Sequence, residues 1–269
     1  MFFKKGFNFY INASVHVAFS SYVFMRITEL YFGLPYNKAL DYFVFFGTIT
    51  GYNFVKYAGV AKLHHRSLTK NLKIIQIFSF ICFGLMCYYA IKLSLRTIVF
   101  IGFFCLLTFL YAIPFLSGFQ KNLRSVGYLK IIIVALVWAG VTVLVPVYDA
   151  HKALNLTVYL TALQRFLLIL VLILPFEIRD MQYDAISLDT IPRRIGIANT
   201  KKLGYVLLIF CLVLEFIITS NTHFKTIFLI VFFSILSLLM RATTKQSKYY
   251  SSFWVEAIPI FWYISLVVF

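Results

Sequence analysis

Nine long apolar stretches limit the folds open to this chain more than any other feature of its sequence. A helix of about 20 residues, each rising about 1.5 Å, crosses the hydrocarbon core of a bilayer. Only 13% of the 269 residues are charged and the mean hydropathy is +0.89, whereas roughly a quarter of the residues in a soluble domain are charged. The sequence therefore predicts an integral membrane protein with crossings at 9–30, 41–60, 73–91, 97–117, 128–147, 157–177, 203–220, 224–241 and 252–269.

Short polar connections join the stretches, and we expect one domain over residues 1–269. The stretches lack the alternation of apolar and polar residues that marks the strands of a membrane β-barrel. No Gly-, Ser- or Pro-rich linker divides them. The expected fold is an all-α bundle of about nine transmembrane helices. The four cysteines lie inside apolar stretches without a CxxC pair, so neither a disulfide nor a zinc site is predicted.

The distribution of Lys and Arg predicts the orientation of the chain. Basic residues gather at the N-terminus and in the second, fourth, sixth and eighth connections, which the positive-inside rule places in the cytoplasm. We expect a bacterial cytoplasmic membrane, with the N-terminus inside and the C-terminus outside. Most of the net charge of +16 follows from this topology and from attraction to anionic lipid. The scattered basic residues form no continuous basic face, which argues against nucleic-acid binding.

Four of the nine acidic residues lie between positions 177 and 189, directly after the sixth apolar stretch. If that helix continues past Phe176, Glu177, Asp180 and Asp184 share one of its faces at i, i+3 and i+7. Mg²⁺ takes carboxylate oxygens and commonly keeps waters or substrate phosphates as its other ligands. Asp180 and Asp184 are therefore candidate Mg²⁺ ligands. The alternative is that these carboxylates only neutralise neighbouring arginines at the membrane surface.

Charged residues inside the apolar stretches need partners or access to water. An ionised carboxylate at this depth costs roughly 2.5 to 3.5 kcal/mol on insertion scales. Glu215, in the seventh stretch, is therefore expected to be protonated, paired or facing a cavity. Arg26 and Arg165 lie toward the outer ends of their stretches and are expected to extend to the interface.

Three motifs resemble those of the UbiA-type intramembrane prenyltransferases. The segment 180–184, Asp-Met-Gln-Tyr-Asp, followed by Thr-Ile-Pro-Arg-Arg-Ile-Gly at 190–196, is similar to the second aspartate motif of that family. The first motif of the family is an Asn or Asp followed four residues later by Asp. Asn53 matches its first position, whereas Tyr57 stands at the position of the Asp. The segment Tyr-Ala-Ile-Pro at 111–114, with Lys121 beyond it, resembles the family pattern at the cytoplasmic end of the fourth helix.

The resemblance implies Mg²⁺-assisted transfer of an isoprenyl group from a prenyl diphosphate to an aromatic or other lipophilic acceptor. It assigns Mg²⁺ to Asp180 and Asp184 and a place in the catalytic site to Asn53. Tyr111 and Lys121 are then candidates for binding the diphosphate. Three further diphosphate candidates follow from charge and side of the membrane alone: Lys62, Arg66 and Arg193.

Tyr57 is the main departure from the family pattern, because the first motif then supplies no carboxylate for a second Mg²⁺ ion. Lys56 could replace one cation electrostatically, although an ammonium group does not bridge phosphate to aspartate as a divalent ion does. Two interpretations remain. The chain is a divergent prenyltransferase with one principal Mg²⁺, or it is a non-catalytic UbiA-like protein that binds lipid or assists another membrane enzyme. No protein partner is predicted.

Overall fold

The computed structural model describes residues 2–63, 70–113, 128–182 and 190–269, apart from the side chains of 2–3, 58–63 and 70–71. All regular secondary structure in these ranges is helical. The elements are α1 (Phe2–Asn12), α2 (Val15–Phe32), α3 (Lys38–Leu63), α4 (Lys70–Ala90), α5 (Leu95–Ala112), α6 (Leu129–Ala139), η2 (Gly140–Leu144), α7 (Val145–Asp149), α8 (Leu156–Asp180), α9 (Ile191–Ile218), α10 (Thr222–Arg241), η3 (Tyr250–Val255) and α11 (Ile258–Val268).

Six of the described segments are long and apolar enough to cross a membrane, namely α4, α5, α6–η2–α7, α8, α10 and η3–α11. Helices α2, α3 and α9, of 18, 26 and 28 residues, are also long enough. Large apolar side chains cover the outer surface, among them Phe80 at 77% and Val99 at 68% exposed. A surface of this kind suits contact with lipid, and the protein is an integral membrane helical bundle with about the predicted number of crossings.

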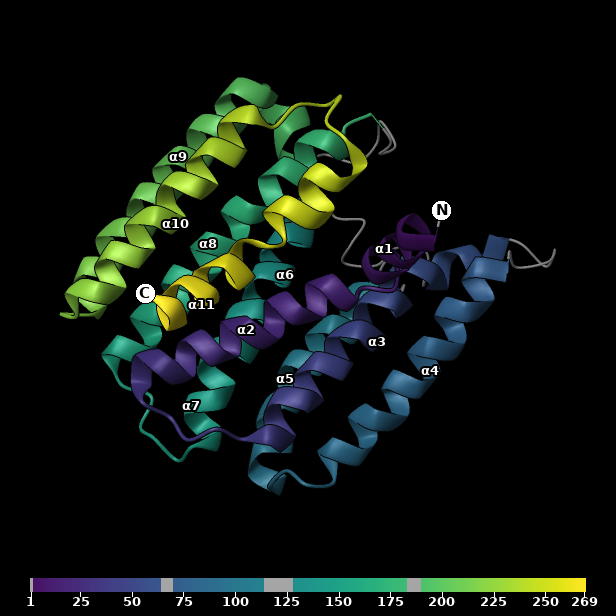
Figure 1. Cartoon of the computed structure of the whole chain (residues 1–269), viewed down its shortest axis with the longest axis horizontal. Helices are drawn as coiled ribbons and strands as arrows, with labels where there is room; N and C mark the ends of the chain where they lie inside the picture. The colour runs from purple at the N-terminus through teal and green to yellow at the C-terminus, as the bar shows by residue number, and fades with distance from the viewer. Residues whose placement is uncertain (1, 64–69, 114–127, 183–189) are drawn as a thin grey trace.

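Contacts between neighbouring helices close the bundle into a ring, in which α3 packs on α2 and on α5. Each helix from α8 to α11 packs on the next, α6 packs on α5 and α8, and α11 returns to α2. In Figure 1, α3 to α5 lie on one side of the bundle and α9 and α10 on the other. The main hydrophobic core lies between α2, α6, α8, α9, α10 and α11, and includes Phe24, Leu168, Leu208, Phe228 and Trp262.

The ends of three crossings differ from the predicted ones. The predicted first crossing, 9–30, is divided between α1 and α2, because Ser14 has a left-handed backbone (φ 62°) that interrupts the helix. Helix α9 begins at Ile191 rather than at 203, with a non-helical Gly196 (φ 80°) in its polar first part. The ninth crossing contains a π-helical segment, η3, before α11.

Glu215 and Arg165 lie in a polar network inside the bundle. Glu215 is 0% exposed and accepts hydrogen bonds from Tyr31 (2.7 Å) and Gln164 (2.8 Å), so the expectation that it is paired is confirmed. Arg165 is 1% exposed and donates to the Phe24 carbonyl at 3.1 Å. The expectation that Arg165 extends to the interface is wrong, because α2, α8 and η2 enclose its guanidinium.

Candidate functional site

A cavity of about 930 Å³ lies inside the ring, between α2, α3, α6, α8 and η3. Charged and polar side chains gather where α8 and α3 approach their C-terminal ends and α6 begins. Apolar and aromatic side chains line the rest. The cavity is therefore amphiphilic, with charge at one end and hydrocarbon-like walls beyond it. The basic residues that line it are Lys56, Lys130, Arg179 and Lys248, and the acidic ones are Glu177, Asp180 and Glu256.

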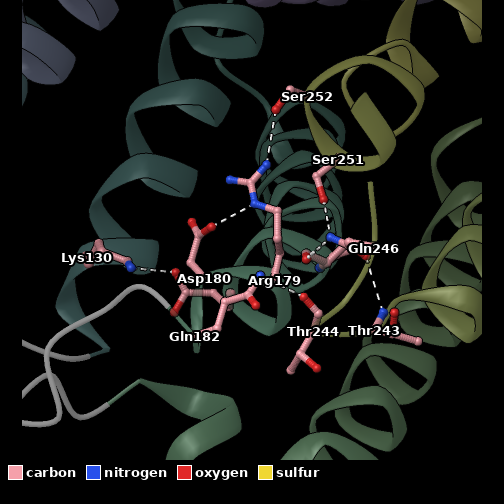
Figure 2. A network of polar contacts seen from close by, with 11 residues as sticks. Lys130, Arg179, Asp180, Gln182, Thr243, Thr244, Gln246, Ser251 and Ser252 are labelled. Atoms are coloured by element: carbon pink, nitrogen blue, oxygen red, sulfur yellow. Dashed lines mark hydrogen bonds and ion pairs between the residues drawn. The ribbon is translucent and has the colours of Figure 1, made fainter. Parts of the chain in front are cut away.

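The end of α8 supplies two ion pairs to the charged end of the cavity. Helix α8 continues past Phe176 as far as Asp180, three residues beyond the predicted end at 177, and places Glu177 and Asp180 one turn apart. The Nε atom of Arg179 lies 2.7 Å from Oδ1 of Asp180, and its Nη1 donates to Ser252 Oγ at 3.1 Å (Figure 2). Lys130 Nζ, at the start of α6, lies 2.7 Å from Oε1 of Glu177.

The polar residues of α3 differ in whether they reach the cavity. Asn53 is 3% exposed and does not line it. Its amide accepts from Ser14 Oγ (2.7 Å) and donates to the Ala13 carbonyl (3.0 Å) and to Ser79 Oγ (2.8 Å). Lys56, one turn later, lines the cavity and is accessible within it, and its Nζ donates to Ser14 Oγ at 2.8 Å. Asn53 therefore holds helices together, while Lys56 presents its charge to the cavity.

The segment between α10 and α11 covers the same end of the cavity. Gln246 donates to the Pro175 carbonyl at 2.8 Å and to Ser251 Oγ at 2.6 Å, which fixes this segment to α8 (Figure 2). Glu256 lies directly after η3 and lines the cavity, where its carboxylate interacts electrostatically with Lys56 and Arg179. The η3 segment is π-helical, and short π-helical segments within helices are frequent at functional sites.

A second cavity, of about 560 Å³, lies beside the first among α3, α4, α5 and α6. Its lining is mainly apolar, including Phe43, Phe83 and Phe109. The two cavities share a boundary, where Trp138 Nε1 donates to the phenol oxygen of Tyr52 at 2.9 Å. The interior thus has a charged compartment and an apolar one. Both are lined by Tyr52, Val55, Tyr111, Val134 and Trp138.

The structure places four of the predicted site residues. Asp180 and Tyr111 line the main cavity, whereas Asn53 lies behind its wall. Arg193 does not line the cavity; its Nη2 donates to the Met181 carbonyl at 2.8 Å and supports the chain directly after Asp180. Other predicted positions fall outside the described residues, namely Asp184, Arg66, Lys121 and the side chain of Lys62.

Of the seven described charged residues that line the cavity, only Asp180 was predicted as a site residue. Lys130 and Lys248 are basic residues of the connections, and the sequence pattern assigned them only to topology. Glu256 lies within the ninth apolar stretch, and the argument that singled out Glu215 applies to it equally. A carboxylate inside a predicted crossing was therefore the signal that could have found it.

The described residues fit at most a single metal ion at this cavity. Where the structure describes the chain, no group of three His, Cys, Asp or Glu side chains is placed to hold a metal. Asp180 faces the cavity, and one or two carboxylates suffice for Mg²⁺ when substrate phosphates supply other ligands. A second ion needs further carboxylates, but position 57 is a tyrosine whose hydroxyl donates to the Asn12 carbonyl at 3.0 Å. Among the described residues, Asp180 is therefore the carboxylate of the predicted metal motif that reaches the cavity.

Ring and cavity together define a helical membrane protein that encloses an amphiphilic site. No family model matches the sequence, and no curated protein matches it. A solved structure described as a digeranylgeranylglyceryl phosphate synthase in membranes is similar over 100% of this chain and 98% of that chain. The TM-score is 0.60 and the sequence identity 14%. The fold is that of the UbiA-type intramembrane prenyltransferases, which confirms the resemblance at the level of fold.

Proposed function

We propose that this protein transfers an isoprenyl group from a prenyl diphosphate to a lipophilic acceptor within the membrane. The observation that carries the proposal is the amphiphilic cavity, which joins Asp180 and four basic side chains to apolar walls. A prenyl diphosphate has the same division between a charged head and a hydrocarbon chain. A structural neighbour described as a synthase of a prenylated glyceryl phosphate supports this assignment.

The residues of the cavity suit the separate demands of such a reaction. Lys130 and Arg179 stand at the charged end and would bind the oxygens of the diphosphate. The allylic C–O bond breaks with its electron pair going to the diphosphate, and the acceptor then bonds to the allylic carbon and loses a proton. Apolar walls such as Ile169 and Leu172 exclude water from the cation, and the rings of Tyr52 and Trp138 face it.

In this proposal, Asp180 and Asp184 would hold one Mg²⁺. The ion would supply positive charge to the departing diphosphate. Arg193 keeps the backbone after Asp180 in place through the Met181 carbonyl, so its role is to position the carboxylate.

Removal of the carboxylate tests the proposal. We expect Asp180→Asn to lower Mg²⁺-dependent transfer from labelled prenyl diphosphates by about 100-fold or more, because it removes a carboxylate that would hold Mg²⁺ at the leaving group. Asp149→Asn is the matched control, since Asp149 lies at the opposite end of the α6–α7 crossing and accepts from Asn37 and Thr97. If purified Asp180→Asn protein transfers at the wild-type rate in lipid vesicles, the assignment of this site is wrong.

The alternative is a non-catalytic protein that binds a prenyl lipid in the same cavity. Two observations favour it: Asp180 is paired with Arg179, and Tyr57 stands where the family motif has a carboxylate. Mass spectrometry of the purified protein separates the two functions. A prenylated product formed in expressing membranes supports catalysis, whereas bound lipid with no transfer from any donor supports the binding protein.

A further inference from the structure

Lys56 lines the cavity and is the neighbour of Tyr57, which stands where the family pattern has a carboxylate. Asn53, Lys56 and Tyr57 share one face of α3 at i, i+3 and i+4. The Asn53 amide is engaged by Ser14, Ala13 and Ser79, so it is committed to the packing of α2, α3 and α4. The first motif therefore offers the cavity an ammonium group in place of a carboxylate.

The ammonium group of Lys56 has a defined position. Its Nζ donates to Ser14 Oγ at 2.8 Å, and the same hydroxyl donates to Asn53 Oδ1 at 2.7 Å. Ser14 is itself fixed by the left-handed turn between α1 and α2. From the opposite wall, the Glu256 carboxylate interacts with Lys56 electrostatically. The chain thus holds this charge at the cavity surface.

The charges that line the cavity favour an anion. Four basic and three acidic side chains line it, which leaves one positive charge in excess. Two of the acids already form ion pairs, Glu177 with Lys130 and Asp180 with Arg179. Glu256 is the third acid, and it competes with any anion for Lys56.

We propose that Lys56 is a built-in cation of the diphosphate site, which takes the electrostatic place of a second metal ion and lets the site bind diphosphate without any divalent metal. This inference rests on the proposed function, because it concerns the head group of the same donor. A lysine binds phosphate as a compact point charge with three donors.

Calorimetric titration of inorganic pyrophosphate into the detergent-purified full chain, with EDTA present, tests the inference. Wild-type protein should bind. Lys56→Met should weaken binding about tenfold or more, because a hydrogen bond to a charged group is lost, while Lys56→Arg should retain most of the affinity. Lys92→Met removes the same charge from an exposed lysine outside the cavity and should have no effect.

Glu256→Gln gives a change in the opposite direction that misfolding cannot imitate. Loss of the competing carboxylate should tighten pyrophosphate binding several-fold in EDTA. The inference is overturned if wild-type protein binds pyrophosphate only with Mg²⁺, or if Lys56→Met binds as wild type does. Transfer assays on the same samples test the proposed function separately: metal-free binding with no transfer to any acceptor contradicts the function and leaves the role of Lys56 standing.

Discussion

The indole Nε1 of Trp138 donates a hydrogen bond to the phenol oxygen of Tyr52 at 2.9 Å, and the two rings meet nearly edge to face, at 85°. This pair stands at the boundary between the charged cavity and its apolar neighbour. If the protein acts on prenyl donors as proposed, we expect the bulk of this pair to limit how much of a long hydrocarbon chain passes from one cavity to the other.

Trp138→Ala should enlarge the passage and shift preference toward longer prenyl donors. We expect the ratio of kcat/KM for a long donor to that for a short one to rise about tenfold, the scale of discrimination by steric fit in an apolar pocket. Trp138→Phe keeps a ring but loses the bond to Tyr52, and should leave the ratio near its wild-type value. An unchanged ratio in Trp138→Ala would show that the pair does not restrict the chain.

Asn53→Ala should destabilise the protein by about 1 to 3 kcal/mol, because buried polar groups of Ser14, Ala13 and Ser79 lose their partner. Thermal unfolding in detergent measures the effect. Asn199→Ala is the control: Asn199 is exposed and bonds only within α9 in the described contacts, so its loss should change stability by less than about 0.5 kcal/mol. Normal stability with lost transfer in Asn53→Ala would instead support the catalytic role expected from the motif.

Gly140→Ala should destabilise the bundle by about 1 to 3 kcal/mol through overpacking. A Cβ at this position would lie 2.0 Å from Cε1 of Phe104, where α5 packs against η2. The double variant Gly140→Ala with Phe104→Ala should show less than the sum of the two separate losses. Gly102→Ala in α5 meets nothing within 4 Å and should be neutral or stabilising. Strict additivity would mean that the two residues do not clash.

Hydropathy and the Asp180 motif were sufficient to predict the fold, because a membrane helix is encoded locally by some 20 apolar residues. Helix ends were harder to predict. Helix α9 starts at Ile191, in a polar segment that a hydropathy criterion passes over, and the left-handed Ser14 is not visible in composition.

The site was predicted less completely, since side-chain partners are set by tertiary packing. A carboxylate or arginine within an apolar stretch signals a need for a partner but does not identify one. The partners of Glu215 are Tyr31 and Gln164, and Arg165 donates to the Phe24 carbonyl. Glu256 lines the cavity directly after η3, a placement that hydropathy along the chain does not reveal.

The contact between α2 and α11 has a consequence for biogenesis. These helices lie near the two ends of the chain and yet pack together to close the ring. A ribosome makes the chain from its N-terminus, so α2 enters the membrane long before its partner exists. The cavity is therefore completed last, when η3 and α11 arrive, and until then Lys56 lacks Glu256 and Asp180 lies beside an unfinished wall. The charged end of the cavity therefore takes its described form only once η3 and α11 have packed against the earlier helices.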